Sequence, residues 1–165
     1  MAGFDYKSLQ ADLGRYLSHL TPADGDMTFA ILKAHLALEQ VLQDYLDRRL
    51  PHPRELDGAR LMFATSLALV RSVCPEPGHY VFAMAKALNG LRNQLAHRLE
   101  PADLAEKTRL FVRDCNNQFP TPMVLTDDIR ADFERITLKV FGFLTSVLGL
   151  HIAFILKERQ VTRLS

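Results

Sequence analysis

Apolar residues recur three and four positions apart in nearly every segment of the chain, and no useful stretch alternates apolar with polar residues. Spacings of three and four place side chains on one face of an α-helix, whereas a half-buried strand needs alternation with period two. A sheet is therefore excluded as the main architecture. The pattern predicts an all-α fold, a single bundle of about six helices.

Prolines, glycines and capping residues divide this pattern into helices. The expected helices cover residues 6–20, 28–50, 56–73, 79–99, 101–116 and 126–159. Asp26 or Thr28 can cap the second of these, and Pro51 and Pro53 follow its end. Since no repeat or linker divides the chain and its length can bury one core, residues 1–165 are expected to form a single domain.

The charges nearly cancel, with 20 Lys and Arg against 19 Asp and Glu and a formal net charge of +1. Such a balance produces no global field that would draw the protein to nucleic acid or to an anionic membrane. Any such partner must therefore be bound at a local site. Cys74 and Cys115 lack the spacing of metal ligands, and no secretory signal opens the chain. Both are expected to be buried thiols in a cytoplasmic protein.

Residues 140–156, VFGFLTSVLGLHIAFIL, form a run of seventeen residues without a formal charge. The run is just shorter than the roughly 18 residues that indicate a membrane span. Thr145, Ser146 and His151 interrupt it, and it continues a charged amphipathic segment. We therefore expect it to lie in the core or in a subunit interface, and no membrane is predicted as a partner.

The segment LNGLRNQLAHRLEP, residues 88–101, combines an apolar stripe with three polar residues of a different character. On a helix of about 100° per residue, Arg92 lies at the edge of the apolar stripe, which is expected to face the core. Asn93 and His97 are related as i and i+4 and lie on a polar stripe. Arg92 and His97 stand about 140° apart, so only the reach of the arginine, or a ligand lying across the helix, can bring them onto one target.

The helix expected over residues 28–50 carries His35 and Glu39 within its apolar face. A buried carboxylate without a partner is strongly destabilising or takes up a proton. Two arrangements meet this requirement: His35 and Glu39 contact each other across one turn, or Glu39 pairs with Arg92. In a working site, Glu39 and His35 would support Arg92 from behind the groups that touch the ligand.

The stretch LRNQLAH resembles the motif of the HEPN superfamily (higher eukaryotes and prokaryotes nucleotide-binding). That motif is an arginine, four to six intervening residues of which the first is often polar, and a histidine. Arg92, Asn93 and His97 match it with the shortest spacing, and the upstream segment HLALEQVLQDYL and the helical layout are similar to the same group. The resemblance implies a small up-and-down bundle that dimerises, so that two copies of the motif line one cleft and cut RNA without a metal.

The motif residues suit this chemistry. Cleaving RNA without a metal needs a base for the 2′-hydroxyl proton and a cation that stabilises the crowded phosphate. His97 suits the first role because imidazole titrates near neutral pH, and Arg92 the second because a guanidinium stays charged and can grip two phosphate oxygens. Asn93 would orient the phosphate or the imidazole. The products would be a 2′,3′-cyclic phosphate and a 5′-hydroxyl, and no cofactor is required.

A separate basic cluster surrounds the LPHP segment. It consists of Arg48, Arg49, His52, Arg54 and Arg60. Such a cluster can follow the phosphate backbone of RNA, and Arg48, Arg49 and Arg54 are the candidates for this role. It can equally be a solvated corner of the protein without a ligand.

Two hypotheses follow. The first is a HEPN-like RNA-binding module or metal-independent endoribonuclease, the effector of a toxin or defence system, whose partners are RNA and an antidote or other partner protein. The second is a non-catalytic regulatory or interaction protein, with a remote likeness to the mannitol-operon regulator family, in which Arg92, Asn93 and Glu39 hold the helices together. We expect a homodimer, formed through the motif helix, the final apolar helix or both.

Overall fold

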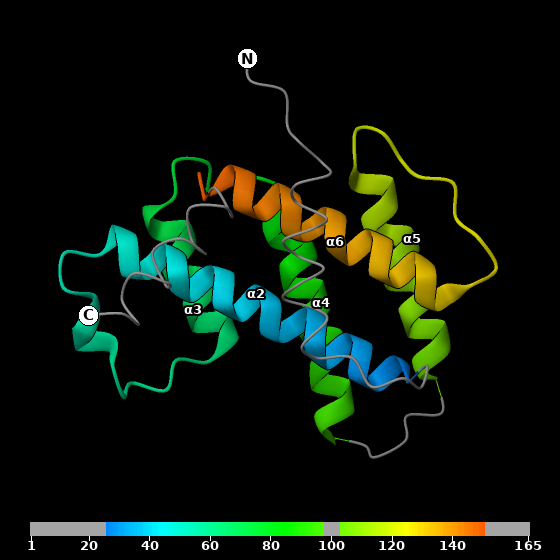
Figure 1. The fold of residues 1–165 in the computed structure, drawn as a ribbon, viewed down its shortest axis with the longest axis horizontal. Coiled ribbons are helices and arrows are strands. Elements are labelled where there is room, and N and C mark those ends of the chain that lie inside the picture. Colours follow the sequence, from blue (N-terminus) through cyan, green and yellow to red (C-terminus); the bar gives the residue numbers. More distant parts are fainter. Residues whose placement is uncertain (1–25, 98–102, 151–165) are drawn as a thin grey trace, which may run out of the picture.

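The computed structural model describes residues 26–97 and 103–150 (Figure 1). These residues form five α-helices and one short 3₁₀ helix, with no strand among them. The elements are α2 (Met27–Arg49), η1 (Pro53–Leu56), α3 (Phe63–Val73), α4 (Val81–His97), α5 (Leu104–Gln118) and α6 (Ile129–Val147). The predicted all-α class is confirmed for this part of the chain. The helix expected over residues 6–20 lies outside the described residues.

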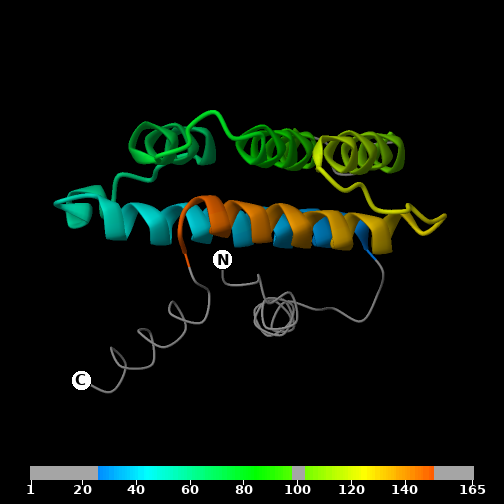
Figure 2. The same cartoon turned by 90° about the horizontal axis from the view of Figure 1, so that it is seen from above.

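The helices are arranged in two crossed layers. Figure 2 looks nearly along the axes of α3, α4 and α5, which form one layer, whereas α2 and α6 run lengthwise across the view in the other layer. This arrangement differs from the single up-and-down bundle that the HEPN resemblance implied. Up-and-down bundles use short connections between antiparallel neighbours. Here the segments 50–62 and 119–128 are long enough to carry the chain from one layer to the other.

The hydrophobic core lies between the two layers, and α4 packs against both α2 and α6. The apolar stripe predicted for α4 is confirmed, because Val81, Met84, Leu88 and Leu91 are buried. Leu95 is partly buried and packs against the same core. Burying each large apolar side chain contributes about 1.5–3 kcal/mol, so this stripe holds α4 firmly between its neighbours.

The start of α2 agrees with the sequence, but the start of α3 does not. Asp26 caps α2, since its carboxylate accepts a hydrogen bond of 2.8 Å from the backbone N–H of Thr28. The helix expected from residue 56 begins only at Phe63. Gly58 (φ +84°) and Arg60 (φ +40°) adopt left-handed backbone conformations. Such conformations cannot continue a right-handed helix, so the chain makes one 3₁₀ turn and starts again.

The end of α6 also differs from the expectation of a helix over residues 126–159. The helix ends at Val147, and Gly149 has φ +63°. The backbone N–H of Leu150 then donates to the carbonyl of Thr145 at 2.8 Å, which is the pattern of a Schellman motif. Glycine adopts this left-handed conformation without the steric penalty of a Cβ, so it ends the helix where apolar periodicity alone would extend it.

The uncharged run over residues 140–156 is divided by this helix end. Val140, Leu144, Leu148 and Leu150 are buried against the core, as expected for a segment that packs inside the protein. Residues 151–156 lie outside the described residues. Within the described part of the chain, no helix has the length and apolar character needed to cross a bilayer.

Both cysteines are free and buried, which confirms the expectation of buried thiols. Burial, together with the nearby carboxylate of Asp114, raises the pKa of the Cys115 thiol to about 12. Cys115 therefore stays protonated at neutral pH. Because the thiolate is the reactive form, this residue is chemically inert in the folded protein.

Candidate functional site

The last turns of α4 place Arg92 and Asn93 next to each other. Arg92 is half-buried and Asn93 is exposed, and Arg92 Nη1 donates to Asn93 Oδ1 over 3.4 Å. Among the described residues the Arg92 guanidinium has no carboxylate partner. His97 is the last residue of α4, but its side chain lies outside the described residues. Of the three motif residues, the structure therefore brings Arg92 and Asn93 together.

Glu39 contacts His35 and does not pair with Arg92. The Nδ1 atom of His35 lies 3.6 Å from Oε2 of Glu39, one turn further along α2. The structure thus forms the first of the two arrangements that the sequence allowed. The side chain of Glu39 is 40% exposed, so solvent satisfies the rest of its carboxylate and no arginine is required. The expected support of Arg92 by Glu39 is not formed, because Glu39 contacts His35 instead.

His35 is buried at the crossing of three helices. Its Nε2 donates to Oδ1 of Asn89 on α4 at 3.0 Å, and its ring centroid lies 4.7 Å from that of Phe63 on α3. Asn89 lies in the sector of the α4 surface between Arg92 and Asn93. The chain Glu39, His35, Asn89 is therefore a polar link between α2 and α4 that fixes the helix beneath Arg92.

Asn89 was not among the residues singled out by the sequence. It is one turn before Asn93, so the helical periodicity already placed it beside the motif. The periodicity could not identify the partner of Asn89, because His35 and Asn89 are 54 residues apart in the chain. A polar residue between two motif positions on a helix surface is the signal that could have found it.

The basic cluster lies apart from the motif. Arg48 and Arg49 are in the last turn of α2, and Arg54 is in η1, all three exposed. Figure 1 shows this end of α2 at the left of the molecule, away from the C-terminal end of α4 at the bottom. The guanidinium of Arg49 already has a cation–π contact, since its Cζ lies 5.5 Å from the ring centroid of Tyr45. The structure does not bring the cluster and Arg92 into one site.

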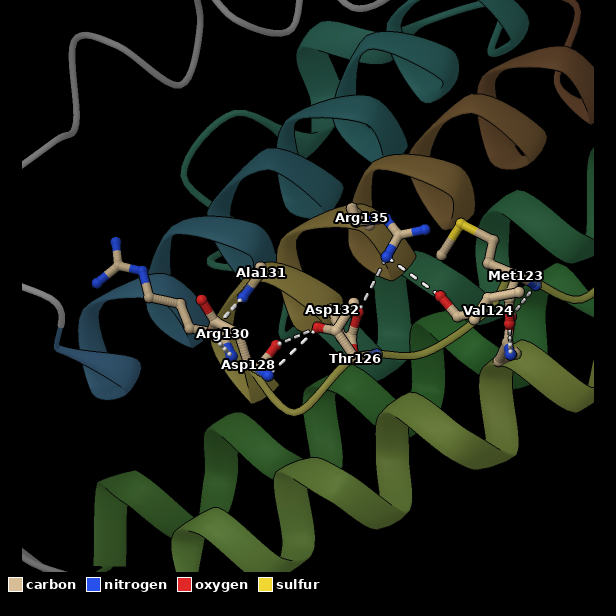
Figure 3. Close-up of polar contacts among 9 residues, drawn as sticks. Met123, Val124, Thr126, Asp128, Arg130, Ala131, Asp132 and Arg135 are labelled. Atoms are coloured by element: carbon tan, nitrogen blue, oxygen red, sulfur yellow. Dashed lines mark hydrogen bonds and ion pairs between the residues drawn. The ribbon is translucent and has the colours of Figure 1, made fainter.

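A second group of polar contacts surrounds the α5–α6 loop, residues 119–128 (Figure 3). Asn116 is buried, and its side chain bonds both backbone groups of Met123, donating to the carbonyl at 2.9 Å and accepting from the N–H at 2.8 Å. Asp132, which is only 2% exposed, accepts from the backbone N–H of Thr126 at 2.6 Å. Two buried side chains from different helices thus hold the backbone of one loop.

Two cations on α6 complete this support. Arg135 Nη1 donates to Asp132 Oδ1 at 3.1 Å and to the carbonyl of Val124 at 3.3 Å. Lys139 Nζ donates to the carbonyl of Thr121 at 2.6 Å and lies 4.3 Å from the ring centroid of Phe119, and burial lowers the pKa of this lysine. The sequence indicated none of these residues, because each acts on backbone groups that no side-chain pattern reveals.

An open groove of about 680 Å³, the α5 groove, lies between α5 and this loop. Its apolar lining includes Leu110, Leu125 and Ile129, and its charged lining includes Arg109 and Asp127 on opposite sides. No group of three or more His, Cys, Asp or Glu side chains in the described ranges is placed to hold a metal ion. The groove therefore offers apolar contact and single charges of both signs.

Comparisons with protein-family models, curated proteins and solved structures find no match to this chain. The HEPN resemblance therefore rests on the motif residues Arg92, Asn93 and His97 and on the helical layout alone. Function is inferred from the chemistry and geometry of the chain's own residues.

Proposed function

We propose that this protein is a HEPN-like RNA-binding module that cleaves RNA without a metal ion, with Arg92, Asn93 and His97 in its site. The supporting observation is the state of Arg92, whose guanidinium contacts only the neutral amide of Asn93 among the described residues. An arginine that anchors helices pairs with a buried carboxylate, whereas an arginine that binds phosphate must remain available. Arg92 is of the second kind, because its guanidinium has no carboxylate partner among the described residues and remains available to bind phosphate.

Each residue has a distinct role in the proposed reaction. Arg92 binds two oxygens of the scissile phosphate, and Asn93 orients the guanidinium through its Oδ1. His97 removes the 2′-hydroxyl proton, and the 2′-oxygen attacks phosphorus. The bond to the 5′-oxygen breaks, and that oxygen takes up a proton. The products are a 2′,3′-cyclic phosphate and a 5′-hydroxyl.

The proposal extends to partners. Arg48, Arg49 and Arg54 would follow the phosphate backbone of a long RNA at the far end of α2, because all three are exposed there. We place the protein in a toxin or defence system, where an antidote or partner protein controls it, and expect it to act as a homodimer.

The test is cleavage of a structured RNA in EDTA by the full chain and by Arg92→Ala, His97→Ala and Lys86→Ala variants. Arg92→Ala and His97→Ala should each abolish cleavage without a change in melting temperature. Arg92→Ala should also lower the slope of RNA affinity against salt by about one, the loss of one phosphate contact. Lys86→Ala removes the same charge from an exposed position earlier on α4 and should retain cleavage. Intact RNA after incubation with the wild-type protein would contradict the proposal.

A non-catalytic regulatory or interaction module is the second candidate. It is favoured by Leu32 and Leu36, which are one turn apart on α2 and exposed in the described part of the chain, as at a protein contact. Its original form, in which Arg92, Asn93 and Glu39 hold the helices together, loses support because Glu39 contacts His35. This candidate predicts that neither the wild-type protein nor any variant cuts RNA.

A further inference from the structure

The outer side of α2, which faces away from the layer of α3, α4 and α5, carries apolar side chains that are exposed in the described chain. Leu32 and Leu36 are 38% and 53% exposed, and each stands nine positions before a core residue of the same helix, Val41 or Tyr45. Nine positions at about 100° per residue place the two side chains of each pair on opposite sides of the helix. Phe29, which is partly exposed and precedes Leu32 by one turn, continues this line. Phe29, Leu32 and Leu36 form the outer stripe of α2.

A buried donor without an acceptor lies beside the outer stripe, where α2 and α6 run next to each other (Figure 2). Arg130 of α6 donates from Nε to Glu134 at 3.0 Å, but its Nη1 is buried and has no hydrogen-bond partner within the described ranges. Burial lowers the pKa of Lys33, the residue after Leu32, and the charges of Glu134 and Arg130 also act on it. These groups therefore share one seam. Because buried donors in folded proteins are paired, further chain with acceptor groups is expected over this seam.

The segment that precedes α2 has a matching apolar stripe in its sequence. Residues 1–25 lie outside the described residues, and the sequence predicts a helix over residues 6–20. On such a helix six apolar side chains fall within about 100° of one another. They are Tyr6, Leu9, Leu13, Tyr16, Leu17 and Leu20. An apolar stripe of this kind must be buried against another element, and the outer stripe of α2 has the same requirement.

The connection between the two stripes is short. Residues 21–26, TPADGD, span at most about 20 Å when fully extended, and the outer stripe begins at the third residue of α2. A helix of residues 6–20 would be about 22 Å long, whereas Phe29 and Leu36 are about 10 Å apart along α2. The segment can therefore cover the whole outer stripe. A tethered segment also has an effective concentration in the millimolar range, which favours it over a separate protein.

We propose that residues 6–20 dock on the outer stripe of α2 and form a third layer over α2 and α6. The two apolar stripes cover each other, and polar groups of the segment supply the acceptor for Arg130 Nη1. The sequence predicted this helix without assigning it a surface. The docked segment makes Leu32 and Leu36 unavailable to a partner protein, which removes the observation that favours a non-catalytic interaction module. This inference goes beyond the proposed RNA chemistry and does not depend on it.

The first test is amide hydrogen exchange of the full chain, followed by mass spectrometry of peptides from residues 6–20. Local opening sets the exchange rate, so a docked segment exchanges slowly. Leu36→Asp places a charge in the apolar contact and should speed exchange in this segment roughly tenfold or more. Leu110→Asp is the matched control, because Leu110 is an exposed leucine within α5, at 40%, and lines the α5 groove. It should leave exchange over residues 6–20 unchanged.

A milder variant keeps the test valid if the charge disrupts α2 itself. Leu36→Ala retains a good helix former and shortens only the contact, so it should speed exchange over residues 6–20 severalfold and leave α4 protected. Wild-type peptides from residues 6–20 that exchange as fast as an unfolded chain would overturn the proposal. Release of the segment by Leu110→Asp but not by Leu36→Asp would place it in the α5 groove instead. Protection that depends on protein concentration would indicate a second copy on the stripe, and either result would also overturn the proposal.

The second test is a double-mutant cycle in urea unfolding, which measures whether Leu13 and Leu36 share one contact. Leu13→Asp should raise the unfolding equilibrium constant roughly tenfold in the wild-type background and less than about threefold when Leu36→Asp is already present. In the Leu110→Asp background its effect should remain roughly tenfold. Equal effects in all three backgrounds would show that residues 6–20 do not contact the outer stripe. Neither test involves RNA, so failure here is distinguishable from failure of the nuclease proposal.

Discussion

The C-terminal end of α4 and the α5–α6 loop both contain many polar residues, but they use them in opposite ways. In the loop, the buried side chains of Asn116 and Asp132 bond backbone groups of Met123 and Thr126. At the end of α4, Arg92 has one long contact with its neighbour Asn93 and no charged partner in the described ranges. Polar residues that maintain the fold are thus separated from polar residues that are available to a ligand.

The physical basis of this difference is solvent. A buried polar atom without a partner destabilises the fold by about 1–3 kcal/mol, so Asn116 and Asp132 are stable only where they bond. Exposed atoms such as those of Asn93 exchange hydrogen bonds with water and are under no such requirement. Substitution should therefore lower stability in the first region and be nearly neutral in the second.

The largest effect is expected from Asp132→Ala. This change removes two charge-assisted hydrogen bonds, from Thr126 N–H and Arg135 Nη1, and should lower the free energy of unfolding by about 3 kcal/mol. Urea unfolding followed by circular dichroism measures the change. Asp127→Ala is the matched control, since the Asp127 carboxylate has no bond within the described part of the chain, and should change stability by less than about 0.5 kcal/mol. Equal urea midpoints for the two variants would show that the loop contacts do not stabilise the fold.

An intermediate effect is expected on α4 itself, from Asn89→Ala. The substitution leaves Nε2 of the buried His35 without its acceptor, and the free energy of unfolding should fall by about 1–2 kcal/mol. Asn93→Ala is the control on the same helix, because it removes the same side chain from an exposed position. It should be neutral or stabilise by a few tenths of a kcal/mol, given the higher helix propensity of alanine. If the two variants unfold alike, the link from α2 to α4 contributes nothing.

The smallest effect on stability is expected from Arg92→Ala. Without a charged partner in the described ranges, the guanidinium contributes little, and the free energy of unfolding should change by less than about 0.5 kcal/mol. Thermal and urea unfolding of the variant and the wild type would show this. A loss of about 3 kcal/mol would instead indicate a broken buried pair and would end the contrast between the two regions.

Local signals in the sequence predicted α2 almost to the residue. Asp26 caps the start of the helix, and Pro51 lacks the backbone N–H needed to continue it. The expected range 28–50 therefore agrees with Met27–Arg49. The same reasoning extended α6 too far. A glycine ends a helix only if its backbone adopts a left-handed conformation, and the sequence alone does not show whether it does. Gly149 does so. Apolar residues continue beyond it in the sequence, and periodicity alone could not distinguish the two outcomes.

The candidate site shows a similar division. The sequence placed Arg92 and Asn93 on one end of a core helix, and the structure puts them there, half-buried and exposed. It left the partner of Glu39 open, and it contained no indication of Asn89 as the partner of His35. Those contacts depend on how α2 and α4 cross, and residue spacing within one helix carries no information about that crossing.

The chain by itself determined the helical class, the apolar side of α4 and the cap of α2, because these depend on residues within a few positions of one another. Only the tertiary structure decided that the helices cross in two layers and that the α5–α6 loop is held from both sides. It also decided that Glu39 contacts His35, which leaves Arg92 without a carboxylate partner in the described ranges. These outcomes depend on distances between segments far apart in the chain. Burial then decides which polar groups must bond and which remain free to meet a ligand.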